Sequence, residues 1–205
     1  MKKFLLHTCC APCSIAIIDE LRNKVDPSTG LRTSLTVFFY NPNIYPESEY
    51  LKRKAEVVKV CEEWGVSIID FENPSGPADH LPLTGEELSG VDYDQSSWNQ
   101  AVKGLESEPE MGARCPVCFT LRLERTAQYA SENNFDIFST SLTSGRNKKA
   151  FIINPIGLEL AKKYNVEYLE EDWKKTGRQE RGRKMVEERG IYRQDYCGCR
   201  YSRST

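Results

Sequence analysis

The sequence is poor in histidine and contains no long apolar run. His7 and His80 are its only histidines, so a histidine-rich zinc site or a non-haem iron site is not expected. No apolar stretch approaches the length of a transmembrane helix. Lys2 and Lys3 are followed by only three apolar residues before His7, too few for a signal peptide. We therefore expect no membrane association and a cytoplasmic location.

The composition is that of a globular protein, with neither internal repeats nor low-complexity tracts. The chain has 205 residues, of which 39% are hydrophobic and 28% are charged, which suits a single domain over 1–205 with a real core. Eight cysteines stand out in this background. In a reducing compartment they indicate metal or redox chemistry rather than a framework of structural disulfides.

The charge is unevenly distributed, although the net charge is only −2. Residues 173–205 contain ten Lys/Arg and four Asp/Glu, and the remainder of the chain is acidic. A basic C-terminal helix and tail on an acidic body fits either contact with a polyanion or a solvated helix face.

Apolar runs alternate with helical patterns along the chain. The expected strands are 3–8, 35–40, 66–71, 136–140 and 166–169. The expected helices start near Pro12, Pro46, Cys115, Asn154 and Arg178, because proline and Asn-Pro favour helix starts. This alternation predicts an α/β fold with a parallel sheet of about five strands.

Residues 72–112 interrupt the alternation. They hold nine acidic residues and one lysine, together with several prolines and glycines. We interpret them as an insertion with one short helix at about 96–105. Insertions of this kind often act as lids.

Two groups of cysteines should meet at one edge of the sheet. Cys9, Cys10 and Cys13 follow the first strand, in the turn where a helix begins. Cys115 and Cys118 open the helix that leads back to the fourth strand. Crossover helices begin at the carboxyl edge of a parallel sheet, and ligands bind there. The loops at 41–45 and 141–154 belong to the same edge.

Cys9, Cys10, Cys115 and Cys118 offer four thiolates, which suit tetrahedral zinc or an iron–sulfur cluster. Adjacent cysteines are awkward ligands for one zinc ion, so we favour a 4Fe-4S cluster. A Cys-x-x-Cys at a helix start is also typical of a thioredoxin-like redox pair.

The remaining candidates are single residues. Cys13 lies one helical turn after Cys10 and could bind a second metal, act as a catalytic thiol or be inert. Cys61 and His7 are expected in the core. Tyr45 could stack on a base or simply pack.

Five stretches together resemble the QueH family of epoxyqueuosine reductases: LLHTCCAPCS (5–14), FYNPNIYPESEYLKR (39–53), GLESEPEMGARCPVCFTLRL (104–123), TSLTSGRNKKAFIINPIG (140–157) and DWKKTGRQERGRKMVEERGIYRQDYCGCRYS (172–202). The resemblance implies a Rossmann-like fold of the HUP type. It also implies a 4Fe-4S cluster on Cys9, Cys10, Cys115 and Cys118, and a redox-active pair formed by Cys197 and Cys199. Some relatives carry Asp at the position of Cys13, where it serves an additional iron.

The implied reaction removes the epoxide oxygen of epoxyqueuosine in a tRNA anticodon loop and leaves queuosine, without cobalamin. An electron donor of unknown identity is needed. Candidate substrate-binding residues at the active edge and in the basic segment are Asn41, Asn43, Tyr45, Arg114, Asn154, Lys174, Lys175, Arg178 and Arg181.

Two other functions stay open. One is another iron–sulfur tRNA-modifying enzyme, such as a thiolase of the ATP-pyrophosphatase type. That class needs a Gly/Ser-rich loop after the first strand, where this chain has Cys-Cys-Ala-Pro-Cys. The other is a non-catalytic zinc or iron–sulfur module that binds RNA.

Overall fold

A five-stranded parallel sheet forms the centre of the computed structural model, which describes residues 2–24, 33–70 and 95–202. The strand order is β3-β2-β1-β4-β5, and every neighbouring pair is parallel. The strands are β1 (Lys3–His7), β2 (Ser34–Phe39), β3 (Ser67–Asp70), β4 (Ile137–Thr140) and β5 (Glu167–Tyr168). This order confirms the predicted Rossmann-like fold.

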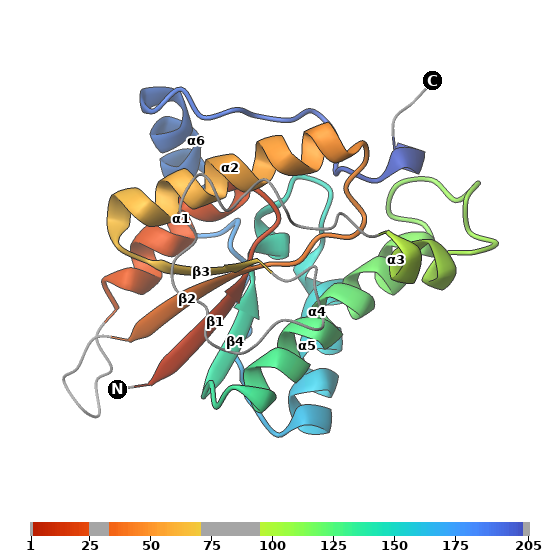
Figure 1. The fold of residues 1–205 in the computed structure, drawn as a ribbon, viewed down its shortest axis with the longest axis horizontal. Coiled ribbons are helices and arrows are strands. Elements are labelled where there is room, and N and C mark those ends of the chain that lie inside the picture. Colours follow the sequence, from red (N-terminus) through yellow and green to blue (C-terminus); the bar gives the residue numbers. More distant parts are fainter. Residues whose placement is uncertain (1, 25–32, 71–94, 203–205) are drawn as a thin grey trace.

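Helices cover both faces of the sheet (Figure 1). Helices α1 (Ala11–Arg22) and α2 (Glu47–Trp64) pack on one face, and α4 (Arg114–Glu132) and α5 (Ala150–Tyr164) pack on the other. Alternate strand residues divide between the two cores: Phe4 and Leu6 join the first, and Leu5 joins the second. Burial on both faces explains why the strands are almost continuously apolar.

Proline and glycine set the helix boundaries where the sequence is clearest. Pro12 lies in the first turn of α1, and Pro46 is the N-cap of α2. Gly65 ends α2 with a φ of 62°, a left-handed conformation that glycine adopts without strain. The predicted bounds of these two helices are therefore close to the observed ones.

Helix α5 begins earlier than predicted. The sequence placed its start at Asn154-Pro155, whereas the helix starts at Ala150 and carries Pro155 inside it. Asn154 does not cap the helix, because its side-chain oxygen accepts a hydrogen bond from Tyr168 Oη at 3.1 Å. This partner lies on β5, so the local sequence could not reveal it.

After β5 the chain forms helix α6 (Arg178–Glu188), which packs against α1. The two helices approach closely at Gly182, where an added Cβ would lie 3.5 Å from the Cβ of Ala16. The chain then runs along α2 toward α3 (Ser96–Ala101), as Figure 1 shows, and the last described element is the short η3 (Arg200–Ser202).

Only part of the predicted insertion is described. Residues 95–112 include the short helix α3, which falls within the expected 96–105. The rest of the predicted lid, up to residue 94, lies outside the described residues.

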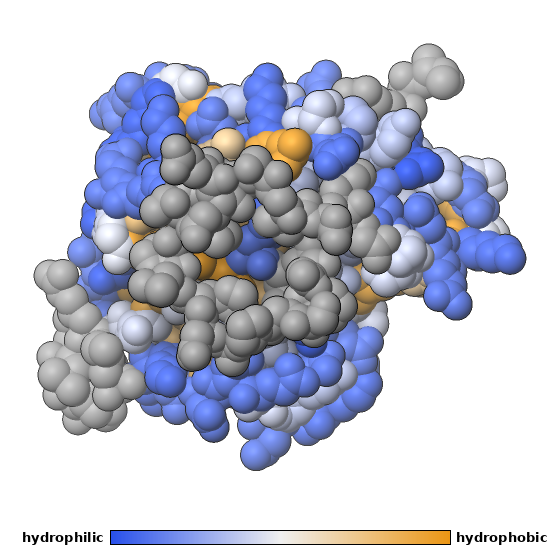
Figure 2. All heavy atoms as spheres, in the orientation of Figure 1, coloured by the Kyte–Doolittle hydropathy of each residue, from blue (hydrophilic) through white to orange (hydrophobic). Residues whose placement is uncertain are grey.

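In the view of Figure 2, the surface over α6 and beside the ends of α4 and α5 is mostly hydrophilic. Among the described helices, none combines the length and apolarity required to span a membrane.

Candidate active site

Three thiols gather in the turn from β1 to α1. The sulfur atoms of Cys9, Cys10 and Cys13 all lie within 4.8 Å of one another, and the sulfurs of Cys9 and Cys10 are 3.7 Å apart. Cys10 is the N-cap of α1, so the positive end of the helix dipole adjoins the group and favours anionic sulfur. Cys9 and Cys10 are buried, and Cys13 is half-buried. This donor set can hold a thiophilic metal.

The three thiols differ in pKa, because they are hydrogen-bonded to one another in a buried setting. Hydrogen bonds from Cys10 and Cys13 hold the pKa of Cys9 well below its usual value, while the hydrogen bonds to Cys13 and Cys9 raise the pKa of Cys10. The pKa of Cys13 is raised to about 11: its hydrogen bond with Cys10 lowers it, but the bond with Cys9 and burial outweigh that effect. Cys9 is therefore the thiolate of the group.

A second pair of cysteines lies on the first turns of α4. Cys115 accepts a hydrogen bond from the backbone N–H of Met111 at 3.1 Å. It packs against the apolar cluster that contains Cys9 and Cys10. Cys118 is buried beside Trp98 and Cys199 instead. The two cysteine groups expected at the carboxyl edge thus border one shared apolar cluster, which Cys115 joins from α4.

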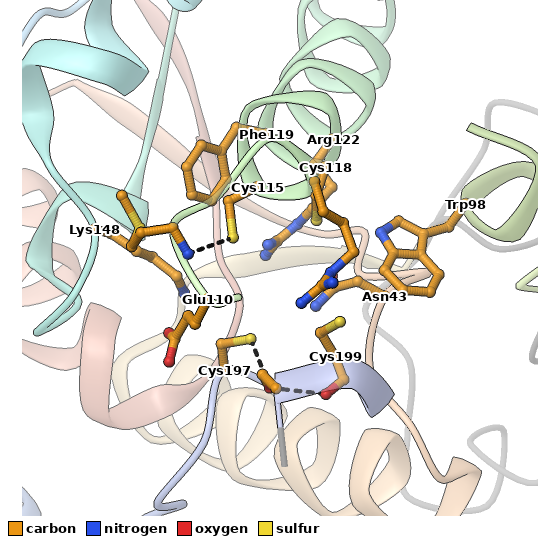
Figure 3. Close-up of a pocket in the computed structure, with 13 residues that line it drawn as sticks. Asn43, Trp98, Glu110, Cys115, Cys118, Phe119, Arg122, Lys148, Cys197 and Cys199 are labelled. Carbon is orange, nitrogen blue, oxygen red and sulfur yellow. Dashed lines mark hydrogen bonds between the residues drawn. The ribbon is translucent and has the colours of Figure 1, made fainter. Parts of the chain in front are cut away.

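The C-terminal cysteines complete this arrangement. Figure 3 shows Cys197 and Cys199 facing Cys115 and Cys118 across a cavity that all four line. Both C-terminal thiols are free. A hydrogen bond with Cys199 lowers the pKa of Cys197 to about 5 and raises that of Cys199 well above its usual value. The sequence alone did not indicate that the two pairs would share a cavity.

Buried cations surround the cysteines. Arg53, Arg122 and Lys148 are each at most 8% exposed. Burial tends to lower the pKa of Lys148, but the negative charge of Cys9 raises it above its usual value. Arg122 donates to Asn41 Oδ1 at 2.5 Å. Sequence reasoning missed these three residues, because lysine and arginine usually belong to the surface.

A larger cavity, of about 780 Å³, opens beside Cys9, Cys13 and Cys197. One wall is the loop of residues 144–148, and another is α6. The basic helix therefore reaches the edge of the sheet that holds the cysteines. This volume lies within the range of small-molecule binding sites.

The predicted substrate-binding residues of the loops fall into two kinds. Asn43 lines the cysteine cavity, and its buried Oδ1 has no hydrogen-bond partner in the described part of the chain. Tyr45 is 43% exposed. Asn41, by contrast, donates to Thr8 O, Asn154 bonds to Tyr168, and Arg114 donates to the carbonyls of Leu105, Glu106, Glu108 and Tyr201.

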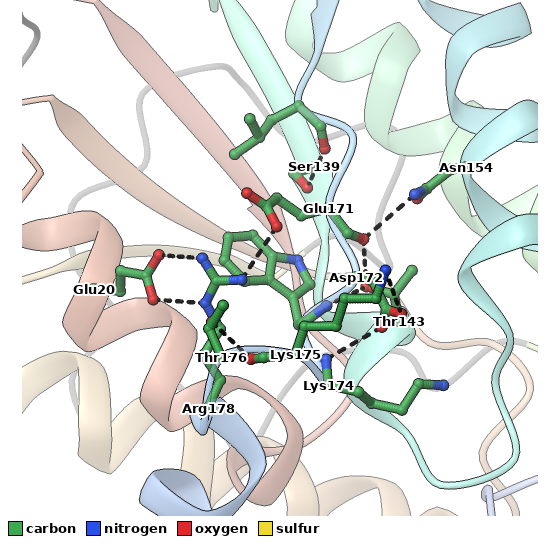
Figure 4. A network of polar contacts seen from close by, with 12 residues as sticks. Glu20, Ser139, Thr143, Asn154, Glu171, Asp172, Lys174, Lys175, Thr176 and Arg178 are labelled. Carbon is green, nitrogen blue, oxygen red and sulfur yellow. Dashed lines mark hydrogen bonds and ion pairs between the residues drawn. The ribbon is translucent and has the colours of Figure 1, made fainter.

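The predicted phosphate-binding residues also divide. Arg178 pairs with Glu20 at 2.7 Å and with Glu171 at 3.1 Å (Figure 4), and Lys174 donates to Gly145 O and Lys148 O. Lys175 has a side chain that is 76% exposed. Arg181 donates to Ala16 O but stays 44% exposed. Further along α6, Arg183 and Lys184 are also exposed.

The fold and the site define a class: a Rossmann-like α/β protein whose sheet edge gathers seven cysteines around buried cations and a ligand-sized cavity. The family model described as epoxyqueuosine reductase QueH matches residues 4–205. The chain belongs to this family, as the motifs predicted.

Curated relatives support this assignment. The epoxyqueuosine reductase QueH of Histophilus somni is 39% identical over 201 residues, covering 98% of this chain and 72% of the relative. That of Acinetobacter baylyi is also 39% identical, covering 98% and 80%, and that of Thermotoga maritima is 34% identical, covering 98% and 91%.

Among solved structures, the chain matches the U34-tRNA thiolase NcsA from Methanococcus maripaludis with its [4Fe-4S] cluster. It is 12% identical, has a TM-score of 0.42, and the match covers 91% of this chain and 66% of that one.

Proposed function

We propose that this chain reduces epoxyqueuosine in the anticodon loop of tRNA to queuosine. The observation that carries the proposal is the gathering of seven cysteines at the carboxyl edge in a member of the QueH family. An unstacked anticodon base can enter a protein pocket, and the cavity of about 780 Å³ beside Cys9 and Cys13 is the proposed place for it. As a tRNA-modifying enzyme, the protein would act in the cytoplasm.

The chemistry requires a source of two electrons and two protons. Two C–O bonds of the epoxide break, a carbon–carbon double bond forms, and the oxygen leaves as water. Oxidation of two thiols to a disulfide releases the required two electrons and two protons. We assign this role to Cys197 and Cys199, which lie close enough in sequence and space to influence each other's pKa. An external donor then reduces the disulfide.

The donor set fits a resident 4Fe-4S cluster. Cys9, Cys10, Cys115 and Cys118 would hold it, and Cys13 would serve an additional iron. The fit is chemical: thiolates are the usual ligands of such a cluster, the sulfurs of Cys9 and Cys10 lie 3.7 Å apart, and Cys115 and Cys118 line the neighbouring cavity. Such a cluster, when bound, supplies one-electron transfer and a Lewis acid for the departing oxygen.

The other residues of the site prepare it for this chemistry. Lys148 and Arg122 place positive charge beside Cys9, which stabilises thiolate sulfur in a buried setting. Asn43 lines the cysteine cavity, and its buried Oδ1, which has no hydrogen-bond partner among the described residues, can accept a hydrogen bond from a ligand. Exposed Lys175 and Arg181 are the proposed contacts to tRNA phosphates, together with Arg183 and Lys184 of α6.

The decisive experiment is anaerobic conversion of epoxyqueuosine-containing tRNA in buffer free of cobalamin, read by mass spectrometry of the released nucleosides. We expect queuosine to form in proportion to the reductant supplied. Iron-replete protein that binds the tRNA and forms no queuosine would contradict the reductase and favour a non-catalytic RNA-binding module. A sulfur-containing nucleoside would instead identify a thiolase.

A further inference from the structure

The segment that carries the C-terminal cysteines is fastened to the N-terminal half of α2. We call residues 192–199 the C-terminal strap. Tyr192 Oη donates to Glu49 Oε2 at 2.9 Å, and the backbone N–H of Tyr45 donates to Gly198 O at 2.8 Å. The hydroxyl of Tyr196 donates to Tyr45 O at 2.6 Å. The strap is therefore docked at several points around its two cysteines.

Arg53 is the central anchor of this strap. Its side chain is 1% exposed, and its Nε donates to Glu49 Oε1 at 2.7 Å. The two remaining nitrogens reach consecutive carbonyls of the strap: Nη2 donates to Tyr196 O at 3.2 Å and Nη1 to Cys197 O at 3.1 Å. The planar guanidinium can serve all three acceptors at once, which an ammonium cannot do.

The strap approaches Arg53 most closely at Gly198. This residue has a φ of +104°, and an added Cβ would lie 2.9 Å from Ile44 Cγ1 and 3.0 Å from Arg53 Nη1. Any other residue would therefore be strained and would collide with the anchor. The glycine between the two cysteines lets the turn approach the arginine.

Arg53 also faces the other cysteine group. It lines the large cavity together with Cys9, Cys13 and Cys197. One side chain of α2 thus joins the strap to the thiols that follow β1.

We propose that Arg53 is the positioning residue of the Cys197–Cys199 dithiol, holding the reduced strap in its seated form beside Cys9 and Cys13. This inference rests on the proposed function only in its assumption that the pair is used in turnover. Oxidation joins the two sulfurs across Gly198 and releases two protons and two electrons to the acceptor. Contacts made to the seated dithiol stabilise the reduced form, so their loss shifts the equilibrium toward the disulfide.

The test uses the full chain with its iron, equilibrated anaerobically in mixtures of reduced and oxidised dithiothreitol. Alkylation followed by mass spectrometry of the strap peptide gives the fraction of Cys197–Cys199 disulfide. We expect Arg53→Met to raise the equilibrium constant for disulfide formation by about tenfold or more, the scale of hydrogen bonds from a charged donor. For Arg53→Lys, the equilibrium constant should lie between those of the wild type and Arg53→Met. The ammonium group keeps the positive charge but cannot bond to both strap carbonyls and to Glu49 at once.

Lys54→Met is the matched control. Lys54 is the next residue of α2, is equally buried, and pairs with Asp70 of β3 rather than with the strap. It should lower stability as Arg53→Met does, but leave the disulfide equilibrium as in wild type. If Arg53→Met and Arg53→Lys also leave that equilibrium unchanged, Arg53 is only a structural ion pair. If Arg53→Met fails to fold, Arg53→Lys decides alone.

The result is independent of the reductase assay, because the equilibrium is measured without tRNA. Unchanged turnover in a variant lacking both strap cysteines would overturn the proposed use of the pair. A shifted equilibrium in the Arg53 variants would still show that Arg53 positions it.

Discussion

At Cys61, burial is the main cause of a raised thiol pKa. This thiol is fully buried in α2 beside Val57 and Val58, and burial raises its pKa to about 12. Cys197, with a pKa lowered to about 5, is a thiolate at neutral pH. Because the thiolate is the nucleophile, native protein treated with iodoacetamide at pH 7 should be alkylated at Cys197 and spared at Cys61.

Peptide mass spectrometry checks this prediction, and denatured protein provides the control in which Cys61 reacts. Cys61→Ala should lower the free energy of unfolding by about 1–2 kcal/mol and leave iron content and turnover near wild type. Loss of iron in this variant would place Cys61 in the site after all.

His7 connects a single residue to pH-dependent stability. Its Nδ1 lies 2.8 Å from Thr140 Oγ1 and its Nε2 3.1 Å from Tyr40 O. The carbonyl can only accept, so Nε2 carries the proton and Thr140 donates to Nδ1. Burial, with the charge of Arg122, lowers the pKa of His7 to about 3, so the ring is neutral in the folded protein.

The unfolded chain therefore binds one more proton than the folded one between about pH 6.5 and pH 3. The free energy of unfolding should fall as the pH is lowered through this window, by up to about 1.4 kcal/mol per pH unit from this residue. Urea denaturation of metal-free protein across pH 7 to 4 measures it. His7→Gln should show a shallower slope; an identical slope would show that His7 is protonated in the fold.

At the scale of elements, the proposed cysteine ligands of the iron–sulfur cluster lie at the starts of α1 and α4. Replacing Cys115 and Cys118 together with Ser should remove most of the bound iron and abolish activity, because two of the four cluster ligands are lost. Iron analysis of anaerobically purified protein measures the effect, with Cys61→Ala as the control. Full iron content in the double variant would refute the assignment.

Element boundaries followed from local sequence where local chemistry sets them. Pro46 and Gly65 mark the ends of α2, and apolar runs located all five strands to within a few residues. The start of α5 was missed, because Asn154 is committed to Tyr168, a partner 14 residues away. The roles of Arg53 and Arg122 were missed for the same reason: buried partners across the fold turn two residues of ordinary surface type into parts of the site.

The basic segment that contains α6 mixes two kinds of cationic side chain. Arg178 is only 16% exposed and pairs with Glu20 and Glu171, so Arg178→Gln should chiefly lower stability, by about 1–3 kcal/mol. Lys175 and Lys184 are 76% and 77% exposed. Replacing both with Gln should weaken tRNA binding and reduce the salt dependence by about one unit of slope per lost phosphate contact.

Binding titrations at several salt concentrations separate the two effects, and thermal unfolding provides the control for stability. Unchanged tRNA affinity in the Lys175/Lys184 variant would show that this face is merely solvated.

At the scale of the whole molecule, residues from opposite ends of the chain form one site. Cys9 and Cys13 lie at the start of the first helix, and the last described segment brings Cys197 beside the same cavity. The sequence predicted the parallel sheet and therefore the shared edge. It could not predict the path of the strap, because that path depends on contacts with Glu49 and Arg53 about 140 residues earlier.

This arrangement leads to a prediction for turnover. If Cys197 and Cys199 supply the two electrons, wild-type protein without reductant should form no more than one queuosine per chain, and the pair should then be found as a disulfide. Cys197→Ser and Cys199→Ser should each keep their iron, because the proposed cluster ligands are intact, and should form no queuosine even in a first turnover, because neither variant can form the disulfide that releases the two electrons. Nucleoside analysis and thiol labelling of the same samples measure both quantities, with Cys61→Ala as the control that retains turnover. A variant lacking both cysteines that turns over at the wild-type rate would show that electrons reach the epoxide by another route, since serine cannot form the disulfide that the proposed cycle requires.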